Sequence, residues 1–184
     1  VPQELNPLIY SNQQLLYDAM YHCVSATIDE LTADTKHLGA KVGYICVLHT
    51  WGSEMNYHPH VHVILLGGGL TAKNQWRDKG TEFFLPVTVL SKLFRSKYLA
   101  ELKYLWEEKK LQFHGSSKKF RNHYTFKELL NTCYEKDWIP HCKKTFNGAQ
   151  SVINYLGKYT HRIAISNHRI IRMDKDTVTY YVKD

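Results

Sequence analysis

Two strand-like segments stand close together in the sequence, with only a short polar connection between them. Residues 41–50 are rich in Val, Ile and Tyr, and residues 60–66 begin with histidines that alternate with valines; both patterns are typical of strands. The connection over 51–57 is too short to hold a crossover helix, so the strands are expected to pair antiparallel. With helical segments elsewhere, this pair predicts an α+β domain whose antiparallel sheet is flanked by helices, rather than regular βαβ units.

The rest of the chain predicts mostly helices. Apolar residues recur at three-four spacing from Ser11, which can cap a helix, to about Lys36. Gly67, Gly68 and Gly69 are expected to end the strand that starts near His60. The other expected elements are an irregular connection at 71–86, helices at 87–110, 125–135 and 149–160, an exposed basic loop at 114–123, an edge strand at 138–144, and a hairpin of 163–173 with 177–182.

The composition favours an anionic partner. The 184 residues carry a formal net charge of +7 at pH 7, and 13% of them are aromatic. Positive charge attracts nucleic acid, and aromatic faces can stack unpaired bases, although solvated lysines give the same charge without such a partner. No apolar run reaches the ~18 residues of a membrane span, and no signal peptide is visible, so no membrane partner is expected.

The cysteine pattern indicates the redox compartment of the protein, and the first residue indicates whether the chain is a fragment. No two cysteines form a CxxC pair, which argues against a zinc ribbon and against a disulfide framework. They are expected to be reduced, mostly buried thiols of a cytosolic protein. The sequence starts at Val1 without an initiator Met, and we therefore expect a fragment of a longer chain. The four cysteines are Cys23, Cys46, Cys133 and Cys142.

The densest chemistry lies at the start of the second strand. Side chains alternate along a strand, so His60 and His62 point the same way, about 7 Å apart along the backbone. Two imidazoles at that separation can converge on one divalent metal ion. His58 has the same parity, but Pro59 disturbs the strand there, and His58 is either a third ligand or a loop residue. The alternative is that these are half-buried strand histidines without a metal.

A second group of reactive residues lies in the expected helix at 149–160. Tyr155 and Tyr159 are four residues apart and therefore share one face of a helix. A phenol has a pKa of about 10 and needs a nearby cation or metal to act as a phenolate nucleophile. Lys158, His161 and Arg162 can supply that charge or hold a DNA backbone. Packing is the ordinary alternative role for such a tyrosine pair.

Together, the histidine and tyrosine segments resemble the signature of the HUH endonucleases, in which two histidines flank a hydrophobic residue, here Val61. Two tyrosines rather than one resemble the two-tyrosine transposases of rolling-circle insertion sequences, the insertion-sequence-ninety-one type. The histidine motif followed by Gly67-Gly68-Gly69-Leu70, and the long tyrosine motif from Tyr155 to Asn167, are both similar to that family. The resemblance covers most of the chain.

The resemblance implies one HUH catalytic domain over residues 1–184, with a compact antiparallel sheet related to the ferredoxin-like folds. Tyr155 or Tyr159 would attack a phosphodiester of single-stranded DNA and form a 5′-phosphotyrosine link, and Tyr155 ranks first because Lys158 completes a Y-x-x-K pattern. Mg²⁺ or Mn²⁺, held by His60 and His62, would stabilise charge on the phosphate. The residues do not decide the third ligand: the candidates are Glu54, a carboxylate just upstream of the strand, and the alternatives His58 and Gln150.

The resemblance also implies that the partner is single-stranded DNA, at the transposon ends and at the target. It implies a cytoplasmic, nucleoid-associated localisation in a prokaryotic cell. Candidate DNA contacts are Lys158, His161, Arg162 and the basic residues Lys118, Lys119 and Arg121. Three alternatives stay open. They are a replication initiator or relaxase of the same class, a decayed DNA-binding module, and a structural zinc protein that uses His58, His60 and His62 in a closed site.

Overall fold

The computed structural model describes residues 1–52, 54–80, 85–142 and 169–182, together with the single positions 153, 157 and 165. The chain divides into two compact units, one of residues 1–46 with 63–145 and one of residues 47–62 with 146–184.

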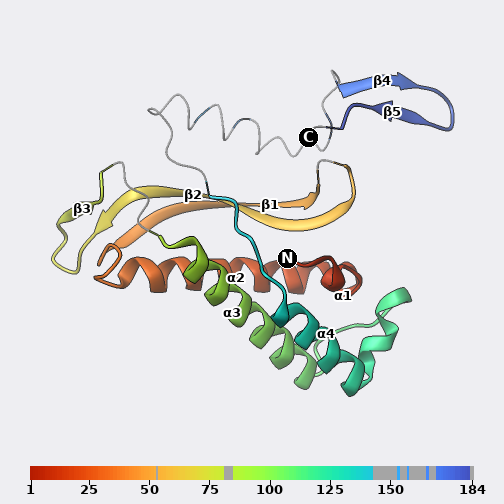
Figure 1. Ribbon diagram of the computed structural model, residues 1–184, viewed down its shortest axis with the longest axis horizontal. Helices are drawn as coiled ribbons and strands as arrows, with labels where there is room; N and C mark the ends of the chain where they lie inside the picture. The colour runs from red at the N-terminus through yellow and green to blue at the C-terminus, as the bar shows by residue number, and fades with distance from the viewer. Residues whose placement is uncertain are drawn as a thin grey trace. The chain divides into compact units, whose positions relative to one another are not determined.

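The described sheet has three strands in the order β1-β2-β3: β1 Lys41–Trp51, β2 Tyr57–Leu70 and β3 Trp76–Asp78. β1 and β2 form the predicted hairpin, closed by the hydrogen bond from the Gly52 amide to the Asn56 carbonyl at 2.9 Å. Helices flank the sheet (Figure 1). The predicted α+β class with an antiparallel sheet is therefore confirmed, and the arrangement is consistent with an HUH-type fold.

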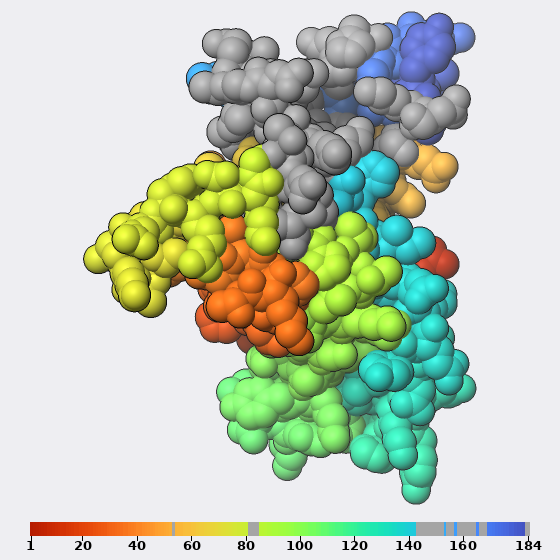
Figure 2. All heavy atoms as spheres, turned by 60° about the vertical axis from the view of Figure 1, so that its left-hand side comes forward, coloured from red at the N-terminus to blue at the C-terminus, as the bar shows by residue number. Residues whose placement is uncertain are grey.

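The glycine run does not end β2, contrary to the prediction. The strand continues to Leu70 and pairs antiparallel with β3, which lies in the segment expected to be irregular. Figure 2 shows this β2–β3 ribbon in yellow. A Cβ on Gly69 would stand 2.3 Å from the Lys41 carbonyl oxygen, and one on Gly68 would stand 2.5 Å from the Trp76 ring. These glycines serve close approach within the sheet rather than strand termination.

Four α-helices and two short 3₁₀ helices are described, and the predictions for 87–110 and 125–135 are confirmed within a few residues. The prediction for the first helix was wrong at its start. Asn6 and Pro7 open a separate helix, in which proline suits the first turn. Ser11 is the last residue of that helix, and its hydroxyl donates to the Pro7 carbonyl rather than capping the longer helix after it. The elements are η1 Gln3–Leu5, α1 Asn6–Ser11, α2 Gln13–Ala33, α3 Val87–Glu107, η2 Gly115–Arg121 and α4 His123–Glu135.

The core of the larger unit lies between the sheet and α2, and α2 packs against α3 (Figure 1). The side chain of Tyr98 on α3 is fully buried, and its hydroxyl donates to the Leu16 carbonyl at 3.2 Å. Apolar side chains from α2, β1, β2 and the α2–β1 connection form the cluster against the sheet. It contains Val24, Ile28, Leu38, Ala40, Val42, Tyr44, Val63 and Leu65.

Two predictions in the segment around α4 were wrong. The basic stretch expected to be a loop forms η2, because Ser117 and Phe120 are buried and fix a helical turn. Residues 138–142 form no strand. Trp138 is instead buried against α3, and its indole N–H donates to the Cys133 carbonyl at 2.9 Å, so the chain follows α4 closely.

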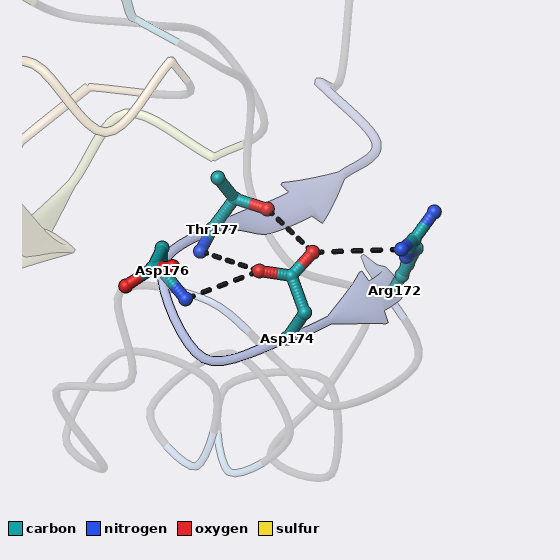
Figure 3. Close-up of polar contacts among 4 residues, drawn as sticks. All are labelled: Arg172, Asp174, Asp176 and Thr177. Atoms are coloured by element: carbon teal, nitrogen blue, oxygen red, sulfur yellow. Dashed lines mark hydrogen bonds and ion pairs between the residues drawn. The ribbon is translucent and has the colours of Figure 1, made fainter.

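The smaller unit contains the predicted C-terminal hairpin, with β4 Ile170–Met173 and β5 Val178–Tyr180 paired antiparallel. Its turn is held by the Asp174 carboxylate, which accepts from the backbone amides of Asp176 and Thr177 and from the Thr177 hydroxyl (Figure 3). Arg172 lies 3.7 Å from the same carboxylate. The hairpin confirms the predicted turn at 174–176.

All four cysteines are free, as predicted. Burial raises the pKa of the Cys23 and Cys133 thiols to about 11, which keeps both protonated and unreactive. None of the helices within the described ranges combines the length and the apolar content that a bilayer span requires.

Candidate metal centre

Three histidines meet on the β1–β2 hairpin. Their nearest ring nitrogens all lie within 4.8 Å of one another. Alternation explains why they meet: Val63 and Leu65 of β2 point into the helix-covered core, so His60 and His62 point to the opposite face. On β1, Val42 and Tyr44 point into the same core, and His49 has the other parity and joins the two histidines of β2.

His60 is oriented by the strand itself. Its Nδ1 lies 2.7 Å from the backbone carbonyl of His58. A carbonyl only accepts, so Nδ1 must carry the proton, and the lone pair is then on Nε2. That Nε2 atom lies 3.0 Å from Nε2 of His62. Two nitrogens bound at right angles to one ion, each at ~2.1 Å, stand ~3.0 Å apart, so the pair has the separation of two adjacent metal ligands.

His49 is the third member of the cluster, and the sequence analysis missed it. It is buried, its ring stacks on Trp51 with centroids 5.0 Å apart at 12°, and its centroid lies 4.4 Å from that of His62. A signal was present in the sequence. In a hairpin, residues equally far from the centre of the connection face each other, and His49 lies about as far before the turn as His60 lies beyond it.

Burial keeps the imidazoles of His60 and His62 neutral. Burial lowers the pKa of His62 to about 4, with a further contribution from the neighbouring rings of His60 and His49. Burial also lowers the pKa of His60 and of His58. Neutral imidazole is the form that binds a metal, so His60 and His62 can accept one near neutral pH without first losing protons.

The other predicted ligands lie elsewhere or outside the described residues. Glu54 is exposed in the hairpin turn, and its backbone carbonyl accepts a hydrogen bond from the Tyr180 hydroxyl at 3.1 Å. The ring of His58 is exposed, and its contribution to the cluster is the backbone carbonyl that orients His60. Neither belongs to the three-histidine group. Gln150 lies outside the described residues. The choice of Glu54, His58 or Gln150 as third ligand therefore stays a prediction.

The predicted tyrosine site falls on residues that are not described. Tyr155, Tyr159, Lys158, His161 and Arg162 all lie outside the described ranges. The three basic residues Lys118, Lys119 and Arg121 are described and exposed on η2, where the Lys119 ammonium stands 5.1 Å from the centre of the Phe120 ring. Their role in DNA binding stays a prediction.

An antiparallel α+β fold with a histidine cluster on its hairpin is consistent with an HUH-type fold. Comparison with known proteins is more specific. Residues 43–184 match the family Y2_Tnp, described as "Putative transposase". The chain belongs to this Y2 transposase family, as the resemblance of its motifs predicted.

Two relatives carry transposase names. The chain is 36% identical over 185 residues to "Putative transposase y4qJ" of Sinorhizobium fredii, an alignment that covers 100% of this chain and 46% of that protein. It is 27% identical over 183 residues to the "Transposase for insertion sequence element IS801" of Pseudomonas savastanoi pv. phaseolicola, which covers 92% of this chain and 39% of that protein. The chain thus spans less than half the length of these relatives. No solved structure matches it significantly.

Proposed function

We propose that this chain is the catalytic domain of a transposase that nicks single-stranded DNA and transfers the strand through a 5′-phosphotyrosine intermediate, with a divalent metal ion bound at the histidine cluster. The observation that carries the proposal is the convergence of His49, His60 and His62 on the β1–β2 hairpin in a chain of the Y2 transposase family. The reaction serves rolling-circle-like DNA transposition.

The donor set fits a metal ion with open positions. Three imidazoles supply three ligands and leave the remaining positions for a phosphate oxygen and water. A bound ion would polarise the scissile phosphate and stabilise the charge that develops in the transition state. Nitrogen ligands suit Mn²⁺ better than Mg²⁺, which prefers oxygen, so Mn²⁺ is the better match of the two. We propose His49 as the third ligand, in place of Glu54.

The nucleophile in this proposal is Tyr155. Its phenol oxygen bonds to phosphorus while the bond to the 3′ oxygen of the preceding nucleotide breaks, which leaves a free 3′-OH and a 5′-phosphotyrosine. The phenol proton passes to solvent or a base, the departing 3′ oxygen takes up a proton from solvent, and Lys158 favours the phenolate by its charge. Tyr159 accepts the second strand. His161, Arg162 and the η2 residues Lys118, Lys119 and Arg121 hold DNA phosphates.

The test is formation of a covalent adduct. The chain is incubated with labelled single-stranded DNA from an element end, in Mn²⁺ or in EDTA, and a denaturing gel shows whether protein and label migrate together. Tyr155→Phe, Tyr159→Phe and the His60→Ala/His62→Ala double variant run beside it. We expect a metal-dependent adduct that is lost in Tyr155→Phe and in the histidine variant.

Other outcomes select among the alternatives. An adduct that is lost only in Tyr159→Phe would mean that Tyr159, and not Tyr155, is the first nucleophile. DNA binding by metal-loaded, folded protein that never forms an adduct rejects the catalytic proposal and leaves a binding module. Unfolding on metal removal, again without an adduct, indicates a structural zinc site instead.

A further inference from the structure

We infer that the β2–β3 ribbon is a binding site for an unpaired base of single-stranded DNA, with the indole of Trp76 as its stacking surface. The choice of DNA as the ligand rests on the proposed function. The geometry of the site is independent of the metal centre, because every residue in it belongs to the larger unit.

Trp76 is held in one orientation and still faces solvent. It pairs across the ribbon with Leu70, and the two side chains are 57% and 50% exposed. The indole edge lies over Gly68, where any Cβ would meet the ring at 2.5 Å. The indole N–H donates to the Asp78 carboxylate at 3.0 Å. The indole thus lies close to the Gly68 backbone, its N–H is already bonded, and the side chain remains largely exposed.

The tip of the ribbon is ordered by its own hydrogen bonds. The Thr71 amide donates to the Gln75 carbonyl at 2.9 Å, and the Asn74 amide donates to the Thr71 carbonyl at the same distance. Lower on the ribbon, the Arg77 guanidinium donates to the Leu38 carbonyl at 3.3 Å and ties β3 to the rest of the unit. A fixed aromatic surface loses little side-chain freedom when a ligand stacks on it.

The surroundings match a nucleotide better than a protein partner. Lys73 at the tip and Lys79 beyond β3 are exposed and can meet phosphates on either side of a stacked base. The exposed large apolar side chains here are those of Leu66, Leu70 and Trp76, and their exposed surface is small beside the ~800 Å² that each partner contributes to a stable protein interface. The ribbon residues lie at one side of the view in Figure 2 and are open there. In a paired duplex the base faces are covered by their neighbours, so the ring selects unpaired DNA.

The test is binding of short oligothymidylate in EDTA, where metal chemistry cannot contribute. Affinities are measured by fluorescence anisotropy of the labelled oligonucleotide for the unchanged chain, for Trp76→Ala and for Tyr134→Ala. Tyr134 is a matched control, because it is a 56% exposed aromatic on α4. An oligonucleotide of the same length with abasic sites keeps the phosphates and removes the stacking partner.

We expect Trp76→Ala to weaken oligothymidylate binding about ten-fold, the usual loss for one stacked base, with Tyr134→Ala unchanged. Binding of the abasic oligonucleotide should not respond to Trp76→Ala. Base stacking also quenches indole emission, so the quenching seen on oligothymidylate addition should shrink in Trp76→Phe.

Unchanged affinity of Trp76→Ala, or an equal loss with the abasic oligonucleotide, would overturn the inference; the second result would mean that Trp76 only shields Gly68 and supports the ribbon. Equal dependence on Trp76 for duplex DNA would overturn it as well. These outcomes are separable from failure of the proposed function. A chain that forms no adduct can still show Trp76-dependent binding, and a chain that forms the adduct can bind without Trp76.

Discussion

Removing His49 tests the metal centre most directly. His49→Ala takes away one of three imidazoles whose ring nitrogens lie within 4.8 Å of one another and leaves the other two in place. Loss of a partner that only orients a ligand weakens metal binding 10–100-fold, and loss of a ligand itself should cost at least as much. We therefore expect Mn²⁺ to bind about 100-fold more weakly, a change of about 2.7 kcal/mol in binding free energy.

The assay is titration calorimetry with Mn²⁺ on metal-free protein, with two controls from the same hairpin. His58→Ala should leave the affinity unchanged, because the backbone carbonyl that orients His60 remains. Glu54→Gln should also leave it unchanged, since Glu54 is exposed in the turn. His49 is buried, so thermal unfolding in EDTA must accompany the titration to separate lost folding from lost binding. A large loss in Glu54→Gln with an unaffected His49→Ala would refute the three-histidine site.

Three further predictions concern the fold. Gly69→Ala should destabilise the protein by roughly 1–3 kcal/mol in urea unfolding, because its Cβ would lie 2.3 Å from a β1 carbonyl oxygen, whereas Gly67→Ala meets nothing within 4 Å and should change little. Equal effects at the two glycines would contradict this account. Trp138→Ala should lower the free energy of unfolding by about 3–5 kcal/mol, because the side chain is buried. Its neighbour Ile139 is 85% exposed, so Ile139→Ala should change that free energy by no more than about 0.5 kcal/mol in the same assay. The hydrogen bond to Lys136 holds the pKa of Glu4 below its usual 4.5, so this carboxylate stabilises the fold above that pH and the contribution is lost as pH falls through the lowered pKa. Glu4→Gln should remove that part of the pH dependence of the unfolding midpoint, and an unchanged profile would show that the contact is unimportant.

Local sequence patterns predicted the helices and turns that are stabilised by interactions between neighbouring residues. The short connection between two β-rich segments was enough to predict the hairpin, and apolar spacing was enough for α3 and α4. The Asn122 side chain caps α4 by accepting from the Tyr124 and Thr125 amides, a local signal that the expected start at residue 125 overlooked. The C-terminal turn follows from Asp174, whose carboxylate closes it with neighbouring groups alone.

Elements that depend on distant partners were not predictable in the same way. The glycine run was expected to break β2, and only the neighbouring β1 carbonyl and the Trp76 ring explain why glycine is needed inside the strand. η2 is held in place partly by a contact of Ser117 with Ser11 at 2.8 Å, between residues more than a hundred positions apart. His49 was missed for a similar reason, since its partners lie on the other strand of the hairpin. His60 and His62 were found because strand alternation brings them together within three residues.

The identity of the third ligand matters for the proposed chemistry because it sets the charge of the centre. Three neutral imidazoles leave a divalent ion with its full charge of two, and a carboxylate from Glu54 would reduce that charge by one. A scissile phosphate carries one negative charge and gains more in its transition state, so a centre built only from histidines attracts it more strongly than one that includes an acid. The lowered pKa of His62 leaves its ring neutral, so an ion does not have to displace a proton from it. The exposed position of Glu54, outside the histidine cluster, thus fits a centre whose task is to hold a phosphate rather than to close around a structural ion.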